Sequence, residues 1–407
     1  MKLRLHKKSS ELNGKIQITG SKSESNRLLI LQALYPAITI KNGSNSHDSQ
    51  VMQEALASKE KEVDIHHAGT AMRFLTAYFS VQEGRETILT GSKRMKERPV
   101  GILVDALKSM GADIEYQGEK GYPPLLIKGK KLDAKEVTLA ANISSQYISA
   151  LMLIGAKFEN GLIINLEGKV TSVPYIEMTR SLLNQLDIKN SFDGQKITLQ
   201  PKKSVAAQNI VVESDWSSAS YYYSLVALSA SAKVILTSYK QESLQGDSAL
   251  SEIYRDFGVE TEFSDNSITL TKMEGFRPKH QKIDLVNSPD IAQTIAVTCF
   301  GLGISCDLMG LHTLKIKETD RLEALRCELT KLGADIQVTK DSLHLKPSEK
   351  INGEVTIATY QDHRMAMAFA PLGLKAPILF EDAEVVNKSY PDFWDDFRGL
   401  GFDCEEV

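Results

Sequence analysis

The stretch LGADIQVTKDSLHLKP, residues 332–347, contains the pattern from which the fold can be inferred. It closes an amphipathic helix, places Gly333 where a helix needs a left-handed C-terminal cap, and continues as two alternating strands around a polar turn. Related stretches occur at four other places, beginning at Met110, Gln185, Phe257 and Leu400, the last one truncated. The recurrence predicts a repeated unit that ends in a helix, a strand, a turn and a strand.

A shorter and more apolar helix is expected upstream of each amphipathic helix. Its start carries a residue that favours helix N-termini. The expected starts lie at about Ser23, Thr70, Ser144, Trp216, Pro289 and His363. These starts are 72 to 74 residues apart, except for the first two, which are 47 apart. The chain therefore contains five nearly full units and a first unit that lacks roughly 26 residues, each built as strand, helix, strand, helix, strand, strand.

Six such units predict two similar α/β domains of three units each. About 70 residues are too few for an independent core, and 407 residues are too many for a single one. The boundary is expected near Val212 to Asp215. Each small sheet should be partly parallel, with the apolar helices inside and the amphipathic helices outside. The alternative, an open solenoid, usually has shorter and more regular repeats.

The composition excludes several classes of protein. With 42% hydrophobic and 25% charged residues, the chain is ordinary for a globular protein and unlike a disordered or fibrous one. The net charge of −4 argues against a general nucleic-acid binder, and no apolar run reaches the roughly 18 residues that span a bilayer. The four cysteines lack disulfide-framework or metal spacing, and the N-terminal segment lacks a signal-peptide core, so we expect a cytoplasmic protein.

Polar motifs cluster at the expected helix starts. At the apolar helices they are GSKSESNR from Gly20, HAGTAMR from His67, SSQ from Ser144, SPD from Ser288 and QDHR from Gln361. The amphipathic helices add RMKERP from Arg94, SVPY from Ser172 and KIKETDR from Lys315, and Lys388 precedes the last helix. Equivalent helices should point the same way, so their positive ends converge and favour an anion site in each domain. Basic residues at helix starts oppose the dipole unless an anion or a carboxylate is close.

Simpler interpretations of these residues stay open at this point. A single lysine or arginine can be a solvated surface charge, and Ser144 or Ser145 can be a helix cap. His363 can be a satisfied helix-start histidine, and Asp290 a favourable first-turn carboxylate. Other chemistry fits less well, because the chain has no Walker A loop, no complete dinucleotide fingerprint, no metal-ligand spacing and no Gly-x-Ser-x-Gly elbow.

Six of the motifs resemble the 5-enolpyruvylshikimate-3-phosphate synthase family, in the family's order and over nearly the whole chain. They are GSKSxSNR from Gly20, AGTAMR from Ala68, RMKERP from Arg94, SSQ from Ser144, KETDR from Lys317 and DHRMAM from Asp362. The resemblance implies the inside-out α/β barrel of enolpyruvyl transferases, with two similar domains of three βαβαββ units. It implies one domain of residues 20–214, a second of residues 1–19 plus 215–407, and an active site in the cleft between them.

The resemblance also implies a reaction. The enolpyruvyl group of phosphoenolpyruvate would pass to the 5-hydroxyl of shikimate 3-phosphate, releasing phosphate, in the shikimate pathway to chorismate and aromatic amino acids. The family is the target of glyphosate and uses no metal or organic cofactor. We expect a cytoplasmic monomer that binds these small substrates and neither nucleic acid nor membrane.

The family's functional residues map onto this chain as three sets. The candidate catalytic residues are Asp290, Glu318 and Lys22. The shikimate 3-phosphate site would consist of Ser23, Arg27, Ser144, Ser145, Gln146, Ser172, Tyr175 and Lys317. The phosphoenolpyruvate site would consist of Lys22, Gly69, Arg94, Gln146, Arg321, Arg364 and Lys388. Lysine, arginine and helix N-termini supply the fixed donors that two phosphates and two carboxylates require.

The chain departs from the family pattern in places. Thr19, His67, Phe74 and Thr313 differ from the family's usual residues, so His67 and Thr313 are not assigned to the site. The shortened first unit, at about Asp48 to Val63, is expected to change a surface and to lie away from the motifs.

Two other functions fit the sequence less well. The related transferase that acts on UDP-N-acetylglucosamine normally has a cysteine in its N-terminal half, whereas all four cysteines here follow residue 298. A catalytically inactive anion-binding scaffold, such as a phosphometabolite sensor, would have no need of both Asp290 and Glu318.

Overall fold

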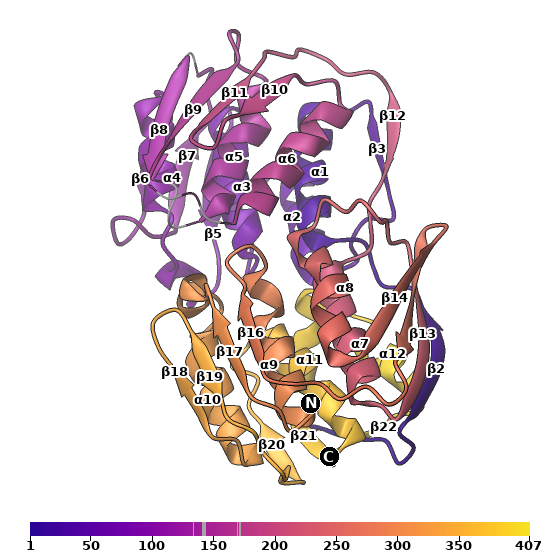
Figure 1. Ribbon diagram of the computed structural model, residues 1–407. Coiled ribbons are helices and arrows are strands. Elements are labelled where there is room, and N and C mark those ends of the chain that lie inside the picture. The colour runs from indigo at the N-terminus through magenta and orange to yellow at the C-terminus, as the bar shows by residue number, and fades with distance from the viewer. Residues whose placement is uncertain (133, 141–143, 169, 171) are drawn as a thin grey trace. The chain divides into compact units, whose positions relative to one another are not determined.

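The computed structural model describes residues 1–132, 134–140, 144–168, 170 and 172–407 (Figure 1). The chain forms two compact units. The N-terminal unit is Gly20–Val212, and the C-terminal unit is Met1–Thr19 together with Glu213–Val407. The second boundary lies within the range of Val212 to Asp215 expected from the repeats, and two residues before the one at 214/215 that the resemblance implies. No helix in the described ranges is long and apolar enough to cross a membrane.

Three sheets belong to the N-terminal unit in the part of the chain that the structure describes. The first four-stranded sheet has the order β4 (Glu62–Asp64), β5 (Glu86–Thr90), β7 (Leu125–Lys128), β6 (Asp113–Tyr116). The second has the order β10 (Asn190–Phe192), β11 (Lys196–Leu199), β9 (Leu162–Glu167), β8 (Glu136–Ala140). The third pairs only β12 (Gln208–Val211) with β3 (Ile38–Lys41), in parallel. Each four-stranded sheet joins one parallel pair to an antiparallel hairpin, as expected for the repeat.

The helices of the N-terminal unit follow the predicted alternation. The apolar set is α1 (Lys22–Leu34), α3 (Gly69–Ser80) and α5 (Ser145–Gly155). The other set is α2 (His47–Ala57), the short 3₁₀ turn η1 (Met95–Glu97) with α4 (Gly101–Ser109), and α6 (Val173–Gln185). Helices α1, α3 and α5 contact one another, and α3 and α5 are buried over almost their whole length.

The C-terminal unit has three four-stranded sheets of the same design. Their orders are β14 (Val259–Ser264), β15 (Ser267–Lys272), β13 (Ser231–Thr237), β2 (Glu11–Ile16); β16 (Gln281–Asp284), β17 (Cys306–Met309), β19 (Leu343–Leu345), β18 (Ile336–Val338); and β20 (Val355–Ile357), β21 (Ile378–Phe380), β1 (Leu3–His6), β22 (Asp403–Glu406). Strand β1 lies between β21 and β22 and so completes the truncated last repeat. Strand β2 pairs in parallel with β13.

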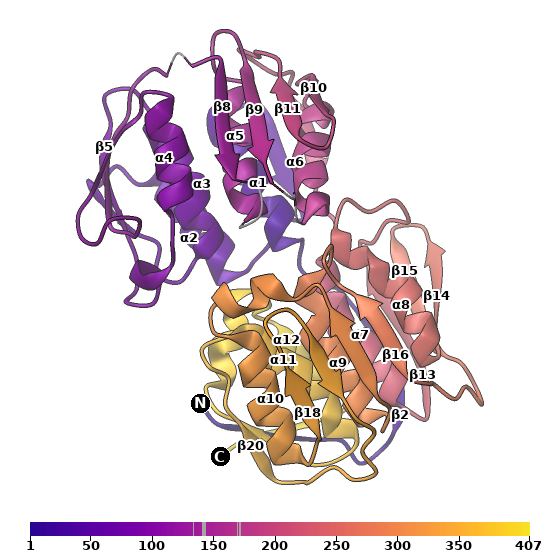
Figure 2. The same ribbon diagram turned by 60° about the vertical axis from the view of Figure 1, so that its left-hand side comes forward.

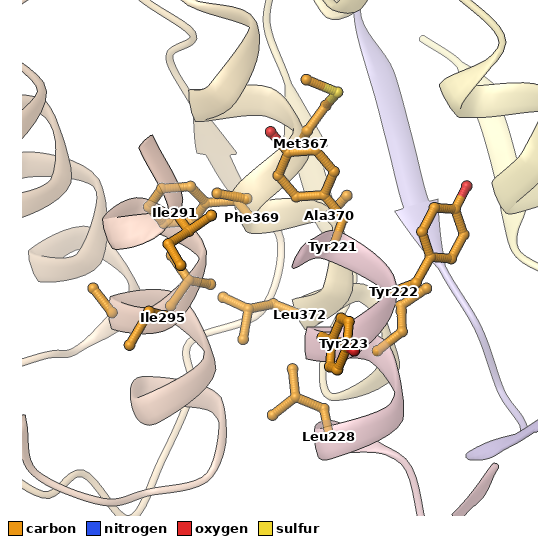
Figure 3. Packing of buried hydrophobic residues seen from close by; sticks show 14 of the residues in the cluster. Tyr221, Tyr222, Tyr223, Leu228, Ile291, Ile295, Met367, Phe369, Ala370 and Leu372 are labelled. Carbon is orange, nitrogen blue, oxygen red and sulfur yellow. The ribbon is translucent and has the colours of Figure 1, made fainter. Parts of the chain in front are cut away.

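The core of the C-terminal unit lies between its three apolar helical segments. These segments are α7 (Trp216–Leu228), η4 (Pro289–Ile291) with α9 (Ala292–Gly301), and α11 (His363–Phe369) with η6 (Ala370–Leu374). They run side by side within the unit (Figures 1 and 2). Tyr221 and Leu228 of α7, Ile295 of α9 and Leu372 of η6 meet there (Figure 3). Burial of these apolar side chains is the main stabilising contribution to the unit.

The amphipathic segments of the C-terminal unit are more broken than the sequence pattern predicts. They are η2 (Gly246–Ala249), α8 (Leu250–Ile253) and η3 (Tyr254–Phe257); η5 (His312–Ile316) and α10 (Arg321–Leu332); and η7 (Ala383–Lys388) and α12 (Phe393–Gly399). The segment before Gly258 was expected to be a single helix. Its first residues, Gly246, Asp247 and Ser248, favour turns over helix interiors, and three short segments form instead.

The expected glycine caps at the C-terminal ends of the amphipathic helices are present, whereas the expected start Thr70 lies inside α3, whose N-cap is Ala68. Helix α10 ends at Gly333, which has a φ of 105° and donates its N–H to Leu329 and Thr330 carbonyls. Gly258 has the same left-handed conformation, with a φ of 77°. In the divergent repeat Asp187 takes this position with a φ of 54°, a conformation that aspartate tolerates better than most residues.

Candidate active site

Arg321 is the centre of the charged cluster in the C-terminal unit. It is the first residue of α10, and its side chain is 2% exposed. Its guanidinium contacts three carboxylates. Nε donates to Asp362 Oδ2 at 2.6 Å, Nη1 to Asp290 Oδ1 at 2.9 Å, and Nη2 to Glu318 Oε2 at 2.8 Å. One buried cation therefore holds both candidate catalytic carboxylates in place.

These carboxylates offset the cost of burying the Arg321 charge. Burial alone lowers the pKa of Arg321, but Asp362, Glu318 and Asp290 raise it more, so the net shift is upward. The guanidinium stays charged at any physiological pH. This satisfies the condition that a basic residue at a helix start needs an anion or a carboxylate nearby.

Two more cations face Asp290. Arg364 Nη2 lies 3.4 Å from Asp290 Oδ2, and Arg364 Nη1 donates to the Asp290 carbonyl at 3.2 Å. Lys317 Nζ lies 3.4 Å from Asp290 Oδ1. Asp290 sits in the 3₁₀ turn η4, just before α9, and its side chain is 16% exposed. Neighbouring cations keep a carboxyl group in its charged form, the form that a general base needs before a substrate proton is transferred to it.

Asp362 connects Arg321 to the start of α11. It is the N-cap residue of that helix, and its Oδ1 accepts from the Arg364 backbone N–H at 2.9 Å. His363 is buried, with Nδ1 3.9 Å from Asp362 Oδ1. Lys388 Nζ donates to the Gln361 carbonyl at 2.7 Å. The cluster thus joins Lys388, Arg364, Arg321, Asp290, Glu318 and Lys317, all of which were candidate site residues.

In the N-terminal unit, Lys22 forms an ion pair that could not be predicted from the sequence. Lys22 is the first residue of α1, and its Nζ lies 3.2 Å from Asp48 Oδ2. The two side chains are only 17% and 11% exposed. The expectation that the shortened unit lies away from the motifs is therefore wrong at Asp48, because the first turn of α2 brings its carboxylate against Lys22.

Arg27 is buried among α1, α5 and α6. Nε donates to Thr179 Oγ1 at 2.8 Å, Nη2 to Ser149 Oγ at 3.0 Å, and Nη1 to the Ser23 carbonyl at 2.7 Å. Burial lowers the pKa of Arg27 to about 10, which still leaves it charged near neutral pH. Nη2 also donates to the Tyr175 carbonyl at 3.4 Å. Arg27 therefore holds Ser23 and Tyr175, two other candidate binding residues, in fixed positions.

The starts of α3 and α5 meet through Gln146. Its Nε2 donates to Thr70 Oγ1 at 3.2 Å, and its backbone N–H donates to Ser144 Oγ at 3.3 Å. Ser144 is thus the N-cap of α5, which agrees with the interpretation of Ser144 as a helix cap. Gly69 begins α3, and a Cβ built there would lie 2.5 Å from Arg98 Nη1. This close approach requires a residue without a side chain, or a displacement of the Arg98 guanidinium.

The remaining candidate residues lie at other helix starts of the N-terminal unit. Ser145 is the first residue of α5. Ser172, at the N-cap of α6, has a left-handed backbone with a φ of 55°. Arg94 precedes η1, is 43% exposed, and has its Nη1 3.1 Å from Glu97 Oε2.

Several polar residues that organise these clusters were not predicted. They are Asp48, Thr70, Ser149, Thr179, Ser217, Asp247 and Asp362. Thr70 and Asp362 carried a usable signal, because Thr70 was itself an expected helix start and an aspartate directly before a helix start is a strong N-cap residue. The others make contacts between elements that are far apart in sequence.

Comparison with known proteins gives consistent matches. The family profile described as EPSP synthase (3-phosphoshikimate 1-carboxyvinyltransferase) matches residues 52–397. A 3-phosphoshikimate 1-carboxyvinyltransferase of Bacteroides fragilis strain YCH46 is 44% identical over 397 residues, covering 97% of this chain and 96% of that protein. One from Colwellia psychrerythraea is 35% identical over 415 residues, covering 95% and 96%.

Solved structures with the same fold have more distant sequences. EPSP synthase from Acinetobacter baumannii aligns with a TM-score of 0.79 at 22% identity, over 100% of both chains. The enolpyruvyl transferase NikO from Streptomyces tendae aligns with a TM-score of 0.75 at 14% identity, over 100% of this chain and 98% of that one. The predicted two-domain α/β fold class is thereby confirmed.

Proposed function

This chain belongs to the EPSP synthase family, and from that membership we propose how its side chains divide the work of the reaction. The protein is a transferase of the shikimate pathway to chorismate and the aromatic amino acids. It transfers the enolpyruvyl group of phosphoenolpyruvate to the 5-hydroxyl of shikimate 3-phosphate and releases phosphate.

The reaction forms one C–O bond, breaks another, and requires three proton transfers. The 5-hydroxyl loses its proton as its oxygen bonds to the central carbon of phosphoenolpyruvate, while the methylene carbon gains a proton. The C–O bond to phosphate then breaks, and the new methyl group gives a proton back. A positioned acid and a positioned base are therefore needed.

Asp290 is the proposed base for the 5-hydroxyl proton. The observation that supports this best is the contact of Arg321 with both Asp290 and Glu318, at 2.9 and 2.8 Å. Three cations beside Asp290 stabilise its carboxylate form in the resting site. Glu318, and Lys22 as a further proton donor, are the proposed groups for the methylene proton. Carboxyl groups in different surroundings can divide such work.

The substrates' anionic groups are proposed to bind the basic residues of both units. Phosphoenolpyruvate would contact Lys22, Gly69, Arg94, Gln146, Arg321, Arg364 and Lys388. Shikimate 3-phosphate would contact Ser23, Arg27, Ser144, Ser145, Gln146, Ser172, Tyr175 and Lys317. Fixed, hydrogen-bonded donors of this kind bind phosphate and carboxylate strongly, because little reorganisation is needed on binding.

One chain supplies all of these residues, which supports a monomer as the active form. We also propose that the protein acts in the cytoplasm. The test of the function is phosphate release by the purified protein. Release should require shikimate 3-phosphate and phosphoenolpyruvate together, and neither alone should suffice. UDP-N-acetylglucosamine in place of shikimate 3-phosphate should give no release. A protein that binds both substrates and never releases phosphate would instead be an anion-binding sensor.

A further inference from the structure

Asp247 is a buried carboxyl group beside the charged cluster of the C-terminal unit. It belongs to η2 and is 4% exposed. Its Oδ2 accepts a short hydrogen bond from Ser217 Oγ. Its Oδ1 has no hydrogen-bond partner among the described residues. A buried carboxylate oxygen without a partner is costly, and protonation is the usual way to reduce that cost.

Ser217 links Asp247 to Arg364. Arg364 Nη2 donates to Ser217 Oγ at 3.3 Å, and the same nitrogen lies 3.4 Å from Asp290 Oδ2. The serine hydroxyl therefore accepts from the guanidinium and donates to Asp247. Asp247, in η2, and Asp290, in η4, therefore interact with the same guanidinium. Asp290 contacts Arg364 directly, and Asp247 contacts it through Ser217.

The groups that face Asp247 set its proton affinity. Burial has the largest effect, and together with the charge of Asp290 it raises the pKa of Asp247 to about 7. Arg364 and the hydrogen bond from Ser217 oppose this rise, and Asp215, the N-cap of α7, adds to it. Asp247 thus changes charge close to neutral pH.

On the basis of the function proposed above, we propose that Asp247 is a positioning residue whose carboxyl group must carry a proton for Arg364 to bind phosphoenolpyruvate well. In its neutral form Asp247 does not compete for the positive charge of Arg364, so the guanidinium interacts with Asp290 and the substrate anion. Its ionised form adds a second negative charge on Arg364, draws the guanidinium toward Ser217, and repels the incoming anion. Raising the pH should therefore weaken phosphoenolpyruvate binding.

The test is the pH dependence of kcat and of KM for phosphoenolpyruvate, at saturating shikimate 3-phosphate. For the wild type, KM should rise by at least about tenfold as the pH passes 7, because ionised Asp247 adds a negative charge beside Arg364 that opposes the substrate anion. Asp247→Asn keeps the shape and removes the titration, so its profile should show only the ionisation of the substrate. Its kcat should stay within about threefold of the wild type, because the residue touches no reacting atom.

Ser217→Ala is an independent second variant. Because the serine hydrogen bond lowers the pKa of Asp247, removing it should shift the rise in KM to higher pH. Asp256→Asn, an exposed charge removal in the same unit, is the control and should keep the wild-type profile. If Asp247→Asn fails to fold, the Ser217→Ala shift decides the question, and an unshifted profile overturns the proposal.

A measurement that needs no turnover tests the protonation of Asp247 independently of the proposed catalytic function. Infrared difference spectra of the ligand-free protein should show a protonated carboxyl band that disappears on raising the pH through about 7 and is absent in Asp247→Asn. A wild type without turnover would refute the activity. Identical wild-type and Asp247→Asn spectra and KM profiles would overturn the role of Asp247 alone.

Discussion

Arg321 Nε lies 2.6 Å from Asp362 Oδ2, and neither side chain is more than 2% exposed. The pair joins the first residue of α10 to the N-cap of α11, 41 residues later. Because Asp362 also caps the Arg364 N–H, this one contact fixes the position of Arg321, with its bound Asp290 and Glu318, relative to Arg364.

Asp362→Ala should destabilise the C-terminal unit strongly. Removing one partner of a buried ion pair leaves an uncompensated charge and typically costs about 3–5 kcal/mol. Both tryptophans, Trp216 and Trp394, belong to this unit, so tryptophan fluorescence during denaturant unfolding reports on it. Asp395→Ala, which breaks the exposed pair with Arg398, should cost less than about 1 kcal/mol. Equal losses for the two variants would contradict the prediction.

Arg27→Lys should raise KM for shikimate 3-phosphate by at least about tenfold. Lysine has one ammonium group and cannot reproduce the divergent bonds to Thr179, Ser149 and the Ser23 carbonyl. Steady-state kinetics give the result, with Arg180→Lys as the control because that guanidinium contacts Glu177 on its own helix. A KM equal to that of the control would mean that the orientation of Arg27 does not matter for binding.

Gly69→Ala should fold normally and bind phosphoenolpyruvate less well. The new methyl group would contact the guanidinium of Arg98, which lies at the end of a flexible side chain and can move away. This displacement would occur at the start of α3, beside the proposed binding site. Inhibition by the longer glyphosate molecule should weaken by a larger factor than the phosphoenolpyruvate KM rises. Gly399→Ala, where a Cβ meets nothing within 4 Å, is the matched control. Equal factors for inhibitor and substrate would remove the steric explanation.

Asp247 should make the stability of the C-terminal unit depend on pH. Its pKa is raised to about 7 in the folded chain, above the ordinary 3.8, so the unfolded chain releases this proton first. Between these two values, its contribution to the free energy of unfolding falls as pH rises, and above pH 7 it levels off. The stability of Asp247→Asn relative to the wild type should therefore increase from pH 5 to pH 8, measured by tryptophan fluorescence. A constant difference would mean that the folded state does not raise this pKa.

The inner helices were predictable because their signals are local. Helices α3, α5, α7 and α11 begin within one residue of the expected starts, and all but α3 have a polar N-cap residue, Ser144, Asp215 or Asp362. The glycine cap at Gly333 is equally local. The repeat spacing then predicted the number of units without any knowledge of their packing.

Contacts between distant elements could not be read in the same way. Nothing local distinguishes β1 as the strand between β21 and β22, because short alternating strands look alike. The pairing of Lys22 with Asp48 depends on how α2 packs against α1. Likewise, the motif residues identified Arg321 but not the geometry that places three carboxylates around it.

The central claim is that Asp290 and Glu318, both held by Arg321, carry the proton transfers of the reaction. Asp290→Asn and Glu318→Gln keep the side-chain shapes and remove the acid–base groups. The direct measurement is kcat for phosphate release by each variant, with substrate binding determined separately. Each kcat should fall about 10²-fold to 10⁴-fold while substrate affinities stay within about tenfold. Wild-type kcat in both variants would contradict the claim and leave Lys22 as the group to test.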